Sequence, residues 1–496
     1  KFFSGPESFT PDTNTLLGEV PEVKNFFVCC GLNSIGIGSG GGVGKVTAEW
    51  LMTGHINEDI FSYDIKRFQK FHSELGFIKK RITESLGDLY GMHWPFKQHK
   101  TSRDIKKLPH HDNLKSFGAC FGVSGGYERP MWFALDGEKA EYEYSYNYQS
   151  WYPSAEYETS NTIKNVGLFD LTPFSKFEIK SDKAHQELQR ICTANIKKDV
   201  GKCTYTHMLN SDGGIETDLT IVAIDENHFR IISSAATRER DKFHIRKYLS
   251  EEIELNDVTD EYCVFGLFGP KSRQLLKTIS KDNFERNDFK FGTAKYITVD
   301  GVKIWAQRLS YVGELGYELY VKFDNAKKIY DLLIEKGKDF NLSNCGMHAM
   351  DIMRMESGFL HWGHDISPEE NQFQAGLSFT ISNKKEVDFI GKKALDKIKK
   401  EKIKSRFAMF TLKESKPGEP LLLHDEPIYQ DDKIIGRSTS GNYSFNFKKN
   451  LVFGYIENKF SDEELTSKNL FIEVEKKKYP ILFQSEPLKR TDFKNL

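Results

Sequence analysis

The 496-residue sequence contains no C-x-x-C pair, and its seven cysteines are an odd number. These two features argue against a disulfide framework and a cysteine zinc site, and they favour a reducing compartment. No long uncharged apolar run is present, so the sequence predicts no transmembrane helix. The formal net charge is only −1, which does not indicate nucleic acid or an anionic membrane as the main partner.

Residues 1–20 do not have the pattern that is expected of a signal or transit peptide, and the first residue is Lys1 rather than Met. Residues 1–20 have the pattern of the middle of a folded domain, so we expect the chain to be a fragment or a processed product. The hydrophobic fraction of 39% and the charged fraction of 28% are typical of a globular protein. The length predicts roughly three domains.

The pattern of the chain changes along its length. After an N-terminal strand–loop–helix unit and a region rich in Lys and His, strand-like segments such as TDLTIVAI alternate with helix-like segments such as NAKKIYDLLIEKGKDF. This interleaving indicates an α/β or α+β domain. The last part contains short strands separated by turns, for example RFAMFTL and NLVFGYI, and it predicts a small barrel or sandwich.

A glycine-rich stretch, GLNSIGIGSGGGVGK, lies between a predicted strand, KNFFVCC, and a predicted helix, KVTAEWLMTGH. Gly36, Gly38 and Gly41 have the spacing G-x-G-x-x-G, but the second parallel strand that a dinucleotide fingerprint needs is missing from INEDIFSYDIKRF. A P-loop fails because Ser39 stands where its first glycine should be. The remaining alternatives are a weakly supported phosphate cradle, a flexible or tightly packed glycine loop, and a loop whose backbone approaches a flat ligand.

Three further segments place charged residues where chemistry is possible. Asp218 lies inside an apolar strand, where an acid must face water, find a partner or serve a site. Glu314 stands between two glycines in SYVGELGYEL, either as a plain hairpin tip or as an acceptor for the N–H groups of a planar ring. Arg354 follows Asp351 by three residues on a predicted helix, a spacing that also suits a surface salt bridge.

Histidines are the remaining candidates for a metal site. His348, His361 and His364 match none of the usual metal-binding spacings, so no metal is predicted.

Five ordered segments resemble the aminomethyltransferase (glycine-cleavage T-protein) family: GLFDLTPFSKFEI, GGIETDLTI, GLFGP, SYVGELGYEL and CGMHAMDIMRMESGFLHWGHDI. The segment EPIYQDDKIIGRSTSGNYS resembles that family's C-terminal barrel. The front end, with GLNSIGIGSGGGVGK, YDIKRF and YERPMWF, resembles the dimethylglycine/sarcosine dehydrogenase family. In that family an FAD-dependent amine oxidase domain precedes a folate-binding domain.

The resemblance implies an α+β fold in four parts. These are the C-terminal end of an FAD-dependent oxidoreductase α/β domain, a connecting module, an aminomethyltransferase folate-binding domain and its C-terminal small β-barrel. The predicted boundaries are residues 1–60, 61–125, 126–400 and 401–496.

The resemblance also reinterprets the glycine-rich stretch as the last strand–loop–helix of the flavin domain, closing around the flavin ring. The implied FAD contacts are Gly31, Asn33, Gly36, Gly38 and Gly41. The family's dinucleotide fingerprint lies further towards the N-terminus, so the chain by itself is not expected to bind FAD well.

In the folate domain, Asp218 aligns with the family's catalytic aspartate, which would deprotonate the folate amine or hold it in its nucleophilic form. Glu314, with Tyr311 beside it, would accept hydrogen bonds from the pterin. Arg354 would meet a carboxylate or brace the site.

Two aromatic residues, Phe174 and Trp362, are candidates for packing against the pterin. The sequence departs from the family at two positions. Gln374 stands where a glutamate is common, which removes a charge near the folate cavity, and Trp362-Gly363 replaces the Tyr-Gly of the T-protein.

The implied reaction has two stages. A hydride leaves the N-methyl group of dimethylglycine or sarcosine for FAD, and the resulting iminium meets tetrahydrofolate, giving methylenetetrahydrofolate and the demethylated amine. The expected partners are therefore small molecules and an electron acceptor for the flavin, in a bacterial cytoplasm or a mitochondrial matrix. Two alternatives remain: a non-catalytic homologue of the type that regulates pyruvate dehydrogenase phosphatase, and a stand-alone folate methyltransferase or demethylase.

Overall fold

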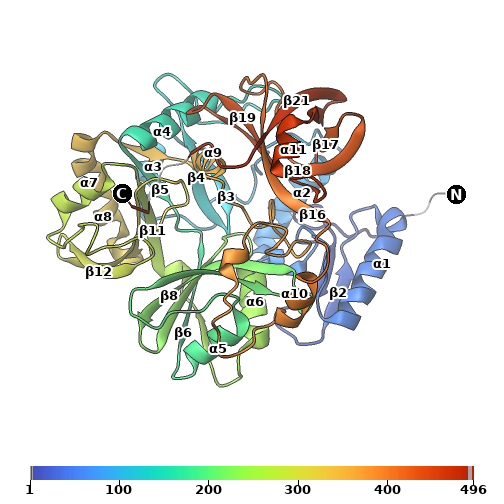
Figure 1. Ribbon diagram of the computed structural model, residues 1–496, viewed down its shortest axis with the longest axis horizontal. Coiled ribbons are helices and arrows are strands. Elements are labelled where there is room, and N and C mark those ends of the chain that lie inside the picture. Colours follow the sequence, from blue (N-terminus) through green and yellow to red (C-terminus); the bar gives the residue numbers. More distant parts are fainter. Residues whose placement is uncertain (1, 3, 490–493, 496) are drawn as a thin grey trace.

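The computed structural model describes residues 2, 4–489 and 494–495. Figure 1 shows two lobes of helix and sheet and a C-terminal barrel, with the N-terminal unit at one side of the molecule. The fold is mixed α+β with a closed C-terminal barrel, as the resemblance predicted. Among the described residues, no helix is both long and apolar enough to cross a membrane.

The N-terminal unit differs from its prediction in two respects, of which the first is that the strand predicted to be buried, β2 (Phe27–Cys30), is partly to fully exposed. Strand β2 pairs antiparallel with β1 (Leu16–Glu19), and helix α1 spans Gly36–Thr53. The helix was predicted to begin at Lys45, but it includes the whole glycine run, although each glycine in a helix interior costs roughly 1 kcal/mol relative to alanine. Trp50 anchors α1, and a Cβ on Gly18 (φ +103°) would lie 2.5 Å from its ring, so only glycine fits there.

A connecting region of short elements joins this unit to the rest of the chain. It contains two 3₁₀ turns, three helices and a β-hairpin: η1 (Ile65–Arg67), η2 (Lys70–Ser73), α2 (Leu75–Leu89), α3 (His111–Ser116), β3 (Ala119–Ser124), β4 (Tyr127–Phe133) and α4 (Tyr152–Lys164).

The first lobe holds a five-stranded antiparallel sheet in the order β10-β6-β9-β8-β7. Its strands are β6 (Ser175–Lys180), β7 (Cys203–Leu209), β8 (Ile215–Asp225), β9 (His228–Ser233) and β10 (Leu255–Asp257). Helices α5 (Ala184–Ile191) and α6 (Arg238–Tyr248) cover one face, where Leu188 and Ile245 join a core with Leu219 and Ile221.

The second lobe holds a six-stranded sheet in the order β12-β13-β14-β11-β5-β15, in which β15 is parallel to β5. Its strands are β5 (Val166–Asp170), β11 (Tyr262–Phe268), β12 (Ala294–Val299), β13 (Val302–Gln307), β14 (Gly316–Lys322) and β15 (Leu342–Cys345). Helices α7 (Ser272–Ile279) and α8 (Phe323–Gly337) pack on one face of it.

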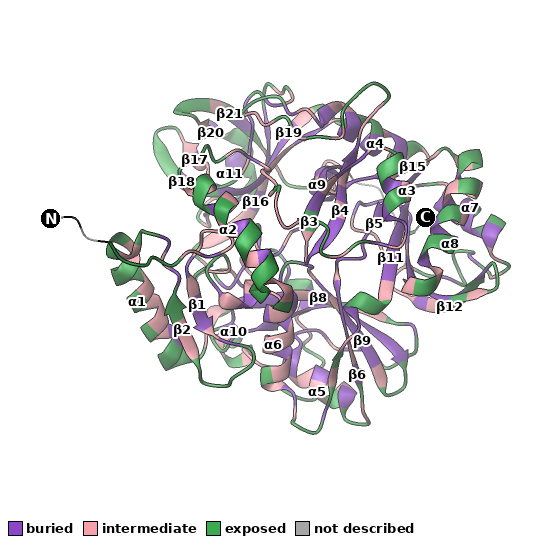
Figure 2. Ribbon diagram, turned by 180° about the vertical axis from the view of Figure 1, so that it is seen from behind, coloured by how far each residue is buried: buried purple, intermediate pink, exposed green. Residues whose placement is uncertain are grey.

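The other faces of the two sheets meet in a shared core. Val222 and Ile224 of β8 pack there with Trp305 of β13 and Tyr320 of β14. Figure 2 shows the buried strands of both sheets in the interior, whereas α1 is largely exposed. Residues on this shared face are therefore the ones that a ligand between the sheets would meet.

The C-terminal barrel closes in the order β16-β19-β18-β17-β20-β21, which selects a barrel over a sandwich. Its strands are β16 (Ser405–Leu412), β17 (Pro427–Gln430), β18 (Lys433–Ser444), β19 (Lys449–Glu457), β20 (Leu470–Val474) and β21 (Lys477–Gln484). Helix α9 (Met347–Glu356) packs against β18 and connects the barrel to the sheets. The remaining short helices are η3 (Thr259–Glu261), η4 (Lys338–Phe340), η5 (Ser378–Thr380), α10 (Lys392–Ile398) and α11 (Asp462–Ser467).

Candidate functional site

Asp218 lies on the face of β8 that is turned towards the second sheet. Side chains alternate along a strand, so Leu219 and Ile221 point into the core under α5 and α6, while Asp218 shares its face with Val222. Asp218 remains partly exposed although its neighbours on both sides in the sequence are buried. A single carboxyl group is therefore placed at the edge of the core between the sheets.

The surroundings of Asp218 favour its protonated form. Burial raises its pKa to about 7, a hydrogen bond with Tyr205 lowers the pKa, and the charge of Asp241 raises it. A group with a pKa near neutrality can both hold and release a proton, which is what general acid–base chemistry requires.

Two residues of β7 accompany Asp218. His207 stands directly opposite it across the antiparallel pair, and Tyr205 lies two residues further along the same face. The Tyr205 hydroxyl lies 3.2 Å from Nε2 of His207, and Nδ1 of the same ring lies 3.1 Å from Oγ1 of Thr380. The sequence analysis missed these residues because cross-strand register is not visible in the sequence, although the spacing of Tyr205 and His207 in CTYTHML is a possible signal.

Tyr311 lies close to both Asp218 and Arg354. Its hydroxyl donates to the Leu360 carbonyl at 2.9 Å, and its ring lies parallel to that of Phe359 with 6.0 Å between the centroids. Burial raises the pKa of Tyr311 well above the usual value. The charge of Arg354 lowers this pKa, and the charge of Asp218 raises it. The structure therefore brings three of the predicted residues into one neighbourhood.

Arg354 is buried and almost fully bonded within the protein. Its guanidinium donates to Asp351 at 2.8 Å, to Asp365 at 2.5 Å, to the Phe359 carbonyl at 3.1 Å and to the Ser440 hydroxyl at 2.9 Å. Of the two roles considered for it, this bonding favours bracing, because it ties α9 to strand β18 of the barrel.

Phe174 contacts the shared core between the sheets and is partly exposed. The ammonium group of Lys176, which is fully buried, donates to the carbonyls of Thr172 at 2.8 Å and Phe174 at 2.7 Å. This lysine therefore holds the turn before β6 in which Phe174 stands.

Glu314 and Trp362 have partners that the sequence did not indicate. The carboxylate of Glu314 forms a buried ion pair with Lys489. Trp362 donates from Nε1 to the Ile215 carbonyl at 3.0 Å, and the guanidinium of Arg240 lies 4.5 Å from its ring centroid. Their roles in folate binding stay predictions, and in this structure both also stabilise loops at the ends of strands.

Glu318 is a second carboxyl on the shared face, and the sequence analysis did not select it. Its neighbours on β14, Tyr317 and Leu319, point to the opposite face of the sheet and belong to the core under α7 and α8. The Tyr320 hydroxyl donates to Glu318 at 3.0 Å. Burial raises the pKa of Glu318 to about 7, and the Tyr320 hydrogen bond lowers it. The sequence signal that could have selected Glu318 is its position two residues after the second glycine of GELGYEL.

The residues predicted to contact FAD fall into two groups. Gly31 (φ +66°) and Asn33 (φ +49°) form a tight turn, and the buried Asn33 side chain accepts from the Thr10 amide at 2.8 Å and donates to the Gly31 carbonyl at 2.6 Å. Gly36, Gly38 and Gly41 lie on α1, and a Cβ at Gly38 or Gly41 would meet nothing within 4 Å. The described residues thus form no enclosed flavin cradle, and the predicted contacts stay predictions.

A small hollow of about 50 Å³ lies where the connecting region meets the first lobe. Residues 54–56 and 58–61 line it from the connecting region, and Glu216, Arg240, His244 and Trp362 are among the residues that line it from the rest of the protein. Asp218 is not among its lining residues, so this hollow is separate from the shared face.

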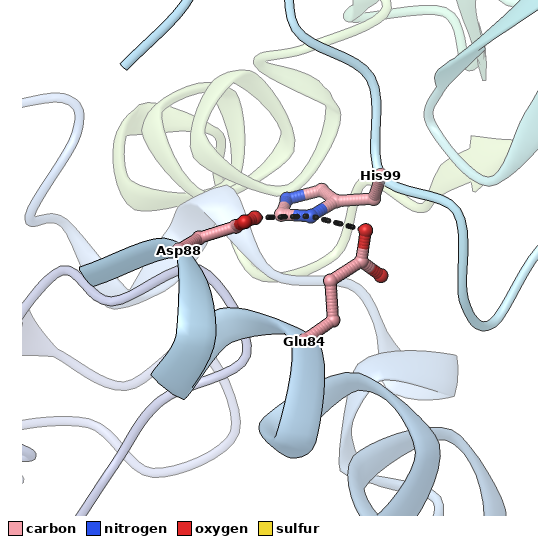
Figure 3. Close-up of side chains that lie close together, drawn as sticks. All are labelled: Glu84, Asp88 and His99. Carbon is pink, nitrogen blue, oxygen red and sulfur yellow. Dashed lines mark ion pairs between the residues drawn. The ribbon is translucent and has the colours of Figure 1, made fainter. Parts of the chain in front are cut away.

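One group of side chains in the described part of the chain is close enough together to hold a metal ion: Glu84, Asp88 and His99 (Figure 3). Nδ1 of His99 lies 3.9 Å from Glu84 and 3.8 Å from Asp88. Glu84 already accepts from the amides of Lys100 and Thr101, and Asp88 is paired with Lys97 at 2.5 Å. Because both carboxylates have protein partners, we base no chemistry on this group.

Asp218 should make stability depend on pH. Its pKa is raised from 3.8 to about 7 by burial, so the folded state binds this proton more tightly than the unfolded state. The contribution of Asp218 to stability is therefore greatest below the unfolded pKa and decreases as the pH rises towards the folded value.

In wild type, the free energy of unfolding should decrease as the pH rises from the unfolded to the folded pKa of Asp218. We expect this decrease to be smaller in Asp218→Asn by about 1–3 kcal/mol. Urea unfolding at a series of pH values measures this. Asp225→Asn, at the exposed end of the same strand, is the matched control. Identical pH profiles for wild type and Asp218→Asn would contradict the expectation.

Comparison with family models gives three matches along the chain. Residues 110–385 match the GCVT N-terminal domain, residues 53–107 match the FAD dependent oxidoreductase central domain, and residues 406–488 match the glycine cleavage T-protein C-terminal barrel domain.

Individual proteins show the same similarity. The chain is 36% identical over 458 residues to 4-methylaminobutanoate oxidase (formaldehyde-forming) of Paenarthrobacter nicotinovorans, covering 92% of this chain and 55% of the relative. It is 28% identical over 496 residues to mitochondrial dimethylglycine dehydrogenase of Rattus norvegicus, covering 99% of this chain and 56% of the relative. The chain thus spans about half the length of these relatives.

A solved structure is similar in fold. The glycine cleavage system aminomethyltransferase T from Bartonella henselae superposes with a TM-score of 0.65 at 21% identity, covering 78% of this chain and 98% of that one.

Proposed function

The chain belongs to the glycine-cleavage T-protein family, in the group that carries an FAD-dependent oxidoreductase central domain, and we propose that it is the folate-dependent part of an N-methyl amino acid oxidoreductase. In this proposal a flavin domain outside the chain described here oxidises an N-methyl group with FAD. The present chain passes the one-carbon unit to tetrahydrofolate, giving 5,10-methylenetetrahydrofolate and the demethylated amine. The sequence prediction names dimethylglycine or sarcosine as the amine.

The observation that carries the proposal is the placement of Asp218. A carboxyl group whose pKa burial raises to about 7, and which Tyr205 lowers, lies partly exposed on the face between the sheets. Tyr311 and Phe174 border the same core, and both are partly exposed. Aromatic rings around one titratable carboxyl suit a flat heterocycle that carries N–H groups.

Each residue then has a defined task. Tetrahydrofolate, when bound, supplies the nucleophilic nitrogen that takes up the one-carbon unit. Asp218 accepts the N–H of that nitrogen, or takes its proton, and keeps its lone pair directed at the carbon. Phe174 and Tyr311 pack against the pterin and exclude water, and Arg354 keeps α9 and the barrel strand in place beneath them.

The first test is folate binding by this chain. We expect both wild type and Asp218→Asn to bind tetrahydrofolate in calorimetric titrations, because the carboxamide keeps an acceptor oxygen at the same position. Phe174→Ala and Tyr311→Ala should weaken binding about tenfold or more through the loss of ring contacts. An absence of folate binding in wild type would overturn the site assignment.

A second test separates the enzyme from its alternatives. In the intact flavoprotein, the flavin should be reduced under anaerobic mixing with an N-methylated amino acid. Sarcosine, dimethylglycine and 4-methylaminobutanoate should all be tried, since one relative is named for the last. A flavin that no amine reduces would favour the regulatory alternative.

A further inference from the structure

Two exposed aromatic rings near Asp218, those of Tyr205 in β7 and Phe379 in η5, have no task in the proposed reaction. Their centroids lie 6.4 Å apart with an angle of 29° between the ring planes, so the rings are stacked. Tyr205 is 37% exposed and Phe379 is 75% exposed, and neither belongs to the core that the described residues form between the sheets. Covering this apolar surface with another flat ring would be favourable, because it would remove the surface from water.

The local structure holds both rings in place. The Tyr205 hydroxyl lies 3.2 Å from Nε2 of His207, and Nδ1 of the same imidazole lies 3.1 Å from Oγ1 of Thr380. Thr380 is buried and attaches η5 to β7, whereas its chain neighbour Phe379 is exposed. The exposed ring is therefore fixed beside β7, which is the edge strand of the first sheet.

The order of the strands places aromatic rings on both sides of Asp218. Phe174 directly precedes β6, and Ser233 of β9 pairs both with the first residue of β6 and with the residue that follows Asp218. Phe174 therefore lies nearly level with Asp218, two strand spacings or about 10 Å away. Tyr205 lies on the opposite side, in β7, two residues from the cross-strand partner of Asp218.

Tetrahydrofolate has a matching division into two ring systems. The carbon of 5,10-methylenetetrahydrofolate bridges N5 of the pterin and N10, and N10 is bonded directly to the aminobenzoyl ring. A carboxyl group that acts on either nitrogen therefore lies between the pterin and the aminobenzoyl ring. The glutamate attached to the aminobenzoyl group carries two carboxylates, which are costly to bury, so this end of the molecule must point to solvent.

We propose that Phe379, stacked on Tyr205, forms the subsite for the aminobenzoyl ring of folate and so distinguishes folates from pterins that lack this ring. The inference rests on the proposed function, in which Asp218 acts on the folate amine. Exposure gives the direction of the ligand. Phe174 and Tyr311 contact the shared core and suit the pterin, whereas the more exposed pair at the sheet edge leaves the glutamate in water.

Phe379→Ala should weaken the binding of tetrahydrofolate about tenfold, because it removes one face of the aminobenzoyl subsite. The binding of 6-methyltetrahydropterin, which has the pterin but no aminobenzoyl ring, should change by less than about twofold in the same variant. Phe379→Tyr keeps an aromatic ring and should bind tetrahydrofolate as wild type does. The Phe379 side chain is largely exposed, so neither substitution should impair folding.

Two further variants serve as comparisons. Phe174→Ala should weaken the binding of both ligands, because its ring is assigned to the pterin. Phe117→Ala removes an exposed phenylalanine at the end of α3 and should leave the binding of both ligands unchanged.

The measurement is anaerobic isothermal titration calorimetry of this chain with each ligand, and urea unfolding of every variant checks that the fold is intact. Equal binding of tetrahydrofolate by wild type and Phe379→Ala would overturn the proposal, as would an equal loss of affinity for both ligands in that variant. Failure of the proposed function would look different. Wild type would then bind no tetrahydrofolate at all, and that result would overturn the subsite together with the function.

Discussion

Asp218→Asn is expected to lower the rate of methylenetetrahydrofolate formation by about 10²- to 10⁴-fold in the intact flavoprotein, which is the usual range for losing a positioned general acid–base group. The carboxamide keeps the shape of the side chain and can still accept an N–H hydrogen bond. It cannot take up a proton at neutral pH, and therefore the loss should be in transfer and not in folate affinity.

Two measurements made together give this prediction its specificity. Stopped-flow reduction of the flavin by the amine should be unchanged in Asp218→Asn, because oxidation is assigned to the other half of the enzyme. Product analysis should show methylenetetrahydrofolate replaced by free formaldehyde, the hydrolysis product of the oxidised amine. Asp225→Asn, on the exposed end of β8, should behave as wild type in both measurements. An unchanged yield of methylenetetrahydrofolate in Asp218→Asn would show that Asp218 is not the catalytic acid–base group.

Arg354→Met is expected to destabilise the protein by about 3–5 kcal/mol, the range for breaking a buried ion pair by removing one partner. Asp365, which is fully buried, would keep hydrogen bonds from Thr439 and Ser440 but lose its only ion-pair partner in the described part of the chain. The variant should unfold at markedly lower urea concentration, with the barrel and α9 separating first.

A surface arginine of the barrel provides the control. Arg437 pairs with Asp425 at 2.6 Å and Glu369 at 2.9 Å, but its side chain is 54% exposed, so Arg437→Met should cost less than about 1 kcal/mol. Adding Asp365→Asn to Arg354→Met should recover part of the lost stability, because the uncompensated charge is removed. Equal effects of the Arg354 and Arg437 substitutions would show that Arg354 does not brace the site.

The local sequence pattern was sufficient to predict those parts of the structure that are specified by their own contiguous residues. The alternating strands and turns of the last ninety or so residues predicted a barrel or a sandwich, and they form a closed barrel. The acid inside the apolar strand TDLTIVAI left three alternatives open, namely facing water, finding a partner or serving a site, and Asp218 stands partly exposed at the edge of the core with a raised pKa. The glycine run shows the limit of this approach, because it was expected to be a loop and is the first half of α1.

Pairings between distant residues could not be predicted in this way. Glu314 pairs with Lys489 and Trp362 bonds to the carbonyl of Ile215, and neither separation corresponds to any helical or strand period. A single sequence contains no direct information about which of many lysines or carbonyl groups will be nearby. Their folate-binding roles therefore stay predictions, whereas their structural partners are now known.

By itself, the sequence determined the fold class, the family and the acid on which the proposed chemistry depends, because strand periodicity and ordered motifs are properties of contiguous residues. Only the tertiary structure decided which face of β8 carries that acid and which groups lie around it. Register places His207 opposite Asp218, and packing of η5 on β7 brings Thr380 to the histidine. Hydrogen-bond direction depends on the whole set of donors and acceptors in contact, and that set exists only after the chain has folded.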